Sequence, residues 1–181
     1  MRSISKPHPG DYSEYASRYI DLLPDDGKII EHLKNNFEET RRLIYSLPEK
    51  ALYYRYAPGK WSIKEVLVHI IDDERIYAYR ILRFARNDQT GLPGFDQELF
   101  NQYADADQRN IDNIFEEYEA VRNATIALLK GLPEDCWERK GQGIGSFTGC
   151  TVRALVYHLA GHELYHLNLI KERYLPGIFD I

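Results

Sequence analysis

The stretch TVRALVYHLAGHELYHLNLIKERYL, residues 151–175, decides the fold expected for this chain. Apolar residues recur in it at three- and four-residue steps and no proline interrupts it before Pro176, so we predict one helix that ends before that residue. Three of the six histidines in the sequence, His158, His162 and His166, follow one another here at four-residue steps. They therefore form a ridge along one face of the helix, beside the leucines that should face a core.

Histidines on a buried face need a hydrogen-bond partner for each ring nitrogen, or a metal that takes the place of one such bond. His158 and His166 are ~12 Å apart along the helix axis, too far to bind one ion together. A single metal site can therefore use His158 with His162, or His162 with His166. His162 belongs to both pairs and is the strongest candidate ligand.

Length and charge limit the classes of function. The chain has 181 residues, which suits one domain with a full hydrophobic core, and a net charge of −5. Without a cluster of lysine and arginine along a face we expect no nucleic-acid partner, and without an apolar run of ~20 residues we expect no membrane span. The N-terminal residues lack an apolar signal segment, so we expect a cytoplasmic protein.

Three further segments have helical periodicity. The first is capped by Asp25 or Asp26 and stops at Pro48, the second begins after Ser62 and reaches about residue 86, and the third covers about residues 109–130. With the C-terminal helix they predict an all-α fold, a four-helix bundle. Residues 1–24 look like an irregular arm packed on the body, with a short turn around residues 12–20, and residues 25–181 form the single domain.

The connection between the second and third helices is long. Gly91, Pro93 and Gly94 exclude a long helix between residues 87 and 108, and so many irregular residues in a small domain usually cover a site. Three aromatic residues should anchor this connection to the body: Phe95, Phe100 and Tyr103.

A third metal ligand is expected from the second helix. His69 lies midway along that helix on an apolar face, and inward side chains of different helices converge in a bundle. His69, His162 and His166 would bind one metal and leave a fourth position open for water or substrate, as in catalytic zinc sites. Three nitrogen ligands suit zinc, nickel, copper or iron.

Other interpretations of these histidines stay open. HELYH at residues 162–166 matches the HExxH pattern of zinc proteases, but no histidine follows His166 to supply their third ligand, and Glu172 is poorly placed. The three could also be ordinary core histidines, bonded to acidic residues or tyrosines. Four residues are candidates for orienting or packing against the metal ligands: Asp72, Asp73, Glu163 and His158. Four others are candidates for lining the pocket: Trp61, Tyr77, Tyr165 and Phe95.

Three stretches carry a family resemblance: GKWSIKEVLVHIIDDERIYAYRILRFARND (59–88), LPGFDQ (92–97) and HLAGHELYHLNLIKERY (158–174). They resemble the DinB/YfiT-like superfamily over about residues 25–175. The resemblance implies a four-helix bundle with a long cross-connection, often a homodimer, whose divalent metal, often zinc or nickel, is bound by His69, His162 and His166. Some members of that superfamily transfer or isomerise groups with low-molecular-weight thiols such as bacillithiol or mycothiol.

Two functions follow as hypotheses. The first is a metal-dependent enzyme, a hydrolase or a thiol S-transferase, that acts on a small molecule by activating water or a thiol cofactor at the open coordination position. The second is a bundle without catalytic activity that binds a metal or small ligand in a stress response. No single residue stands out as a general base or as a thiol anchor.

Overall fold

Each of the four periodic segments contains one long helix of the bundle. The computed structural model describes residues 3–179, which fold as an all-α protein whose β pairing is limited to isolated bridges. The expected fold class is therefore confirmed. The long helices are α2 (Ile29–Tyr45), α3 (Ile63–Ala85), α5 (Ile111–Gly131) and α6 (Val152–Leu169); the short ones are α1 (Glu14–Ile20), α4 (Gln97–Tyr103) and α7 (Leu175–Phe179).

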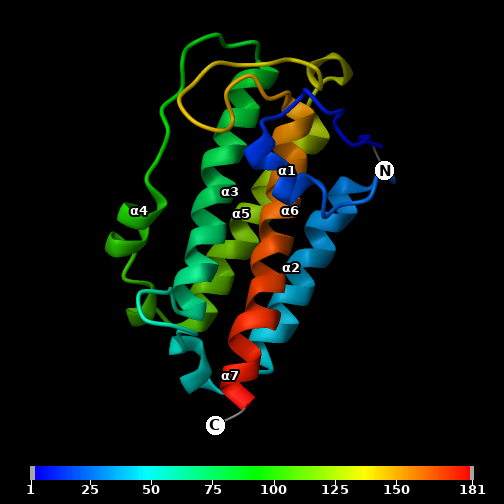
Figure 1. Ribbon diagram of the computed structural model, residues 1–181. Coiled ribbons are helices and arrows are strands. Elements are labelled where there is room, and N and C mark those ends of the chain that lie inside the picture. The colour runs from blue at the N-terminus through cyan, green and yellow to red at the C-terminus, as the bar shows by residue number, and fades with distance from the viewer. Residues whose placement is uncertain (1–2, 180–181) are drawn as a thin grey trace.

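Helix direction explains the long connection. In the bundle α3 packs against α5 and α6, and α2 packs against the same two helices from the other side. Figure 1 shows that α3 and α5 run in the same direction, so residues 86–110 must return along the length of the bundle before α5 begins. The short helix α4 lies on this return path, beside α3.

Helix starts follow their capping residues. Ser62 makes the full capping box with Glu65: its hydroxyl accepts the Glu65 N–H at 3.1 Å, and its own N–H donates to the Glu65 carboxylate at 2.6 Å. The expected cap of the first helix at Asp25 or Asp26 is wrong, because α2 begins only at Ile29. The Asp26 carboxylate instead accepts the N–H of Lys28 at 2.9 Å and lies 3.0 Å from the His32 ring.

The C-terminal segment does not end before Pro176 as expected. The α-helix stops at Leu169, and a π-helical turn over residues 170–174 leads into α7, which contains Pro176. In this wide turn the Leu175 N–H donates to Ile170 O, five residues back. Pro176 then falls in the first turn of α7, where a residue without an N–H is tolerated.

The return connection is attached differently from the expectation. Phe100 and Tyr103 are exposed, and the buried apolar residues of this segment are Leu92 and Ala106. Leu92 pairs with the loop before α6: its N–H donates to Gln142 O and its carbonyl accepts the Ile144 N–H, both at 3.0 Å. Phe100 and Tyr103 were poor guides because α4 packs on the outside of the bundle, where it buries none of its residues, whereas Phe95, before α4, is half-buried.

The N-terminal segment contains α1, which packs against α6. Ile4 is buried, and its N–H donates to Gly27 O at 3.0 Å. The division into an arm and one domain at residue 24 stays a prediction. Within residues 3–179, no helix combines the length and the apolar character that a membrane span requires.

Candidate metal centre

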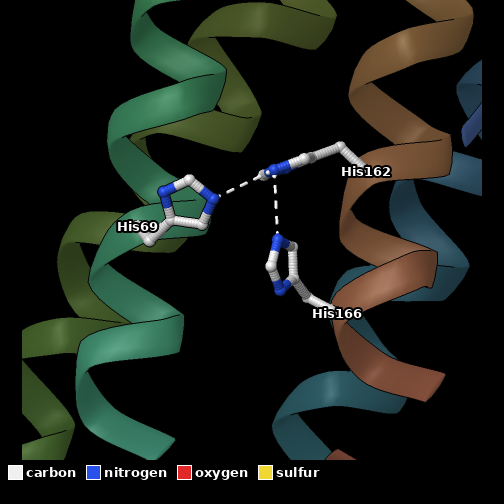
Figure 2. A group of neighbouring side chains, drawn as sticks. All are labelled: His69, His162 and His166. Carbon is white, nitrogen blue, oxygen red and sulfur yellow. Dashed lines mark hydrogen bonds between the residues drawn. The ribbon is translucent and has the colours of Figure 1, made fainter. Parts of the chain in front are cut away.

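Three histidines meet between α3 and α6. Figure 2 shows the rings of His69, from α3, and of His162 and His166, from α6, pointing toward one another. The Nε2 atom of His162 lies 3.1 Å from Nε2 of His69 and 3.2 Å from Nε2 of His166. All three side chains are buried, and their ligand atoms lie within 4.8 Å of one another. The structure thus brings together the three residues that the sequence singles out.

Hydrogen bonds alone do not satisfy this arrangement. A neutral imidazole nitrogen carries either a proton or a lone pair, so Nε2 of His162 can bond properly to only one of its two neighbours. Protonation is disfavoured: burial lowers the pKa of His69 and of His162, and lowers the pKa of His166 to about 3. Nδ1 of His166, also buried, has no hydrogen-bond partner among the described residues. Three facing nitrogen atoms that resist protonation suit a metal cation.

Asp73 lies behind His162. Its Oδ2 atom is 3.4 Å from Nδ1 of His162, the nitrogen that points away from the other two histidines, and 3.4 Å from Nε2 of His158. The His158 ring stacks on Tyr77, with ring centroids 3.8 Å apart and planes 6° apart. His158 therefore packs beside the three-histidine group and shares a carboxylate with it, as expected for a residue that is not itself a ligand.

Two of the expected orienting carboxylates lie elsewhere. Glu163 accepts a bond from the Tyr118 hydroxyl and pairs with Arg122 at 2.8 Å. Burial raises the pKa of Glu163 to about 7. Asp72, one residue before Asp73, is half-buried on the side of α3 that faces charged residues of α5, and burial raises its pKa. A helix turns neighbouring residues by ~100°, so residues next to Asp73 and His162 point away from the site.

Two cavities adjoin the histidines. The larger, of about 280 Å³, is lined by His162, His158 and the expected pocket residues Tyr77 and Phe95. The smaller, of about 180 Å³, is lined by His166 and the expected Trp61. Gln97, at the start of α4, borders both, so the return connection covers this side of the site. The Trp61 ring packs 4.8 Å from that of His69, and its Nε1 donates to Glu98 of α4 at 3.2 Å.

The fourth expected pocket residue, Tyr165, is exposed and is not among the residues that line either cavity. Its ring meets the edges of the Tyr19 and His166 rings, with centroids 5.3 Å apart in both pairs. Tyr165 thus packs beside His166 without lining a cavity.

Comparison with known proteins agrees with this description. The family model described as the DinB superfamily matches residues 32–170, most of the chain. The chain belongs to the DinB superfamily. A relative from Oceanobacillus iheyensis named "Putative metal-dependent hydrolase OB0413" is 30% identical over 146 residues, which are 80% of each chain. The structure of YfiT from Bacillus subtilis, described as a probable metal-dependent hydrolase with an unusual four-helix bundle topology, matches with a TM-score of 0.73 over 84% of this chain and 87% of that one, at 15% identity. That likeness shows the shared fold.

Two residues of this DinB bundle adjoin the site without having been expected from the sequence. Tyr19 of α1 packs its ring against His158 and His162, with centroids 4.9 and 5.2 Å away. The approach of α1 depends on Gly161, where a Cβ atom would lie 2.2 Å from the Tyr19 carbonyl oxygen. The available signal for Tyr19 was a glycine inside α6 beside His162, and the signal for Arg80 was its helical spacing on the face of α3 that carries His69 and Asp73. Arg80, the second residue, is buried in the wall of the larger cavity.

Proposed function

We propose that the protein is a metal-dependent enzyme in which His69, His162 and His166 bind one divalent metal. The observation that carries this proposal is the convergence of three Nε2 atoms, 3.1 and 3.2 Å apart in the two close pairs. Two ligands placed 2.0–2.1 Å from a tetrahedral ion are about 3.3–3.4 Å apart, so the observed spacing needs little change to hold zinc or nickel. The names of the two relatives, both metal-dependent hydrolases by description, support the same proposal.

The residues around the histidines suit a catalytic site better than a purely structural one. Three protein ligands leave a coordination position open, whereas structural zinc sites are closed by four. Both cavities reach the histidines, so a small substrate can approach. Asp73 is placed to orient the His162 ring by accepting its Nδ1 proton, as partners of metal-binding histidines usually do.

A bound divalent metal would lower the pKa of a coordinated water or thiol, which is the chemistry of a hydrolase or of a thiol S-transferase. The surrounding residues of the chain position the histidines and shape the space next to them. The Trp61 ring packs on His69 and the Tyr19 ring packs on His162, so both limit the space for bulk water at the site. We place hydrolysis first because both relatives are described as hydrolases.

Metal analysis of natively purified protein tests the shared premise. We expect about one equivalent of zinc or nickel in the wild type, and loss of that metal in His162→Ala. His158→Ala is the matched control, because His158 is a buried histidine of the same helix that is not one of the three proposed metal ligands. Wild-type protein that neither contains metal nor binds added zinc or nickel would refute the proposal.

Turnover separates an enzyme from a binding protein. Ester and amide substrates and thiol-conjugation pairs are assayed before and after chelation. We expect activity that chelation removes and metal restores. Activity unaffected by chelation and by His69→Ala would exclude a catalytic metal, and metal binding without turnover across the panel would favour the non-catalytic alternative.

The proposal includes two features of the protein in its cell. A homodimer comes from the family resemblance and is measured by light scattering during size-exclusion chromatography. A cytoplasmic location is tested by fractionation of the source cells, and a small molecule or thiol as the substrate is tested by the turnover assays.

A further inference from the structure

Arg80 carries a buried charge that is not ion-paired with any carboxylate of the described residues. It is 3% exposed, and within residues 3–179 it forms no ion pair. Arg122, also 3% exposed, shows what a structural arginine requires in this bundle: it pairs with both Glu74 and Glu163 at 2.8 Å. A guanidinium stays charged in proteins and is costly to bury alone, so the difference between these two arginines calls for a ligand.

The guanidinium is held in position by neutral groups. Its Nη2 donates to Pro93 O at 3.2 Å, it bonds to the Tyr77 hydroxyl, and its Cζ lies 3.6 Å from the Phe147 ring centroid. The two hydrogen bonds leave N–H donors unused on a group that has five. The donors that remain are of the kind that binds an oxyanion through two parallel bonds.

Arg80 lies in the wall of a cavity that reaches the histidines. Arg80 and His162 both line the cavity of about 280 Å³. Backbone bonds fix the wall around Arg80: residues 92 and 142–144 pair with each other, and the Ser13 hydroxyl donates to Ser146 O at 2.7 Å. A preformed cavity of this size suits a small molecule.

We propose that Arg80 binds a carboxylate group of the substrate in the cavity that it shares with His162. A carboxylate fits better than a phosphate monoester, which carries nearly two negative charges. Arg80 is the only lysine or arginine in the described lining, and Asp73 already places one carboxylate there. The charges of Arg80 and Asp73 offset each other, so a bound carboxylate adds one net negative charge to the cavity, whereas a phosphate monoester adds nearly two.

The position of Arg80 determines where the carboxylate of the substrate lies relative to the three histidines. Arg80 follows Asp73 by seven residues, ~10 Å along α3, so the carboxylate binds away from the three histidines. The remainder of the molecule then extends past Tyr77 toward His162. This part rests on the proposed function, whereas carboxylate binding by Arg80 does not need a metal.

Binding measurements on the chelated full-length protein therefore isolate Arg80 from the metal. The probes are benzoate, phenylacetate and 3-phenylpropionate, their uncharged amides, and phenyl phosphate, titrated while amide NMR spectra are recorded. We expect at least one carboxylate to shift resonances of residues around the cavity. Arg80→Met should weaken its binding at least tenfold, and Arg80→Lys should restore part of the affinity. Arg86→Met is the matched control, since Arg86 is an exposed arginine at the end of the same helix.

Each outcome decides the matter. Carboxylate binding lost in Arg80→Met and kept in Arg86→Met supports the inference, even if no metal is found at the histidines. No shift with any carboxylate in the wild type, equal binding in Arg80→Met, or tighter binding of the amides or of phenyl phosphate overturns it. Stability serves as the check on folding: because Arg80 lacks an ion pair, Arg80→Met should unfold at a denaturant concentration no lower than the wild type.

Discussion

Replacing Asp73 by asparagine tests whether this carboxylate supports the metal site. The change keeps the size of the side chain and removes its charge. Asp73 contacts Nδ1 of His162, the ring that faces both other histidines, so the effect should reach the metal through a single ligand. We expect a weaker metal site in an otherwise intact bundle.

The size of the effect follows from the contact distance. Loss of a partner that orients a metal-binding histidine typically costs 10–100-fold in affinity. The Asp73 oxygen lies 3.4 Å from His162 and equally far from His158, longer than a direct hydrogen bond and divided between two rings. We therefore expect the lower end of that range for Asp73→Asn, about tenfold, or about 1.4 kcal/mol of binding free energy.

Competition between the chelated protein and a chromophoric chelator for zinc, repeated with nickel, measures this affinity. Asp72→Asn is the matched control: it makes the same chemical change one residue away, where the carboxylate faces α5. Two results would refute the reasoning. Asp73→Asn could bind zinc and nickel as tightly as the wild type, or Asp72→Asn could lose as much affinity as Asp73→Asn.

Three further predictions concern the stability of the chelated bundle. Burial lowers the pKa of His166 to about 3, below its value near 6.5 when unfolded, so its contribution to stability is complete above about pH 6.5 and falls as the pH drops. From about pH 7 to 5 urea titrations should show the wild type losing about 2 kcal/mol more than His166→Gln does; equal losses would contradict the shift. Gly161→Ala would push its Cβ against the Tyr19 carbonyl and should cost about 1–3 kcal/mol, whereas Gly131→Ala, with open space around it, should cost nothing. Arg122→Met leaves two buried carboxylates without their cation and should cost about 3–5 kcal/mol in the same titration, a loss that an additional change of one carboxylate to its amide should reduce.

The sequence predicts the parts of the site that periodic patterns encode. Ser62 and its capping box set the start of α3, which fixes the face on which His69 lies. The four-residue steps of α6 place His162 and His166 on one face. Because α3 and α6 pack against each other, these three side chains meet without a contribution from any loop.

Contacts between segments far apart in the sequence could not be read from it. Asp72 and Asp73 are equivalent as letters, and only the rotation of α3 within the bundle decides which of them faces His162. Glu163 looked like a partner of its histidine neighbours, but it is rotated by ~100° from His162 around α6 and pairs with Arg122 of α5. Tyr19 reaches the site only because α1 folds back onto Gly161.

The connection between α3 and α5 forms part of the walls of both cavities. Because α3 and α5 run in the same direction, the connection between them must pass along the outside of the bundle, over the side where His162 and His166 meet their cavities. That connection supplies Pro93 to hold Arg80, and Gln97 to border both cavities. The metal ligands come from the rigid helices, while the walls that select a substrate come from a segment that packs outside the core. Substitutions in the connection should therefore alter which substrate binds while leaving metal affinity unchanged, whereas substitutions at Asp73, which contacts His162 and also lines the larger cavity, should alter metal affinity as well.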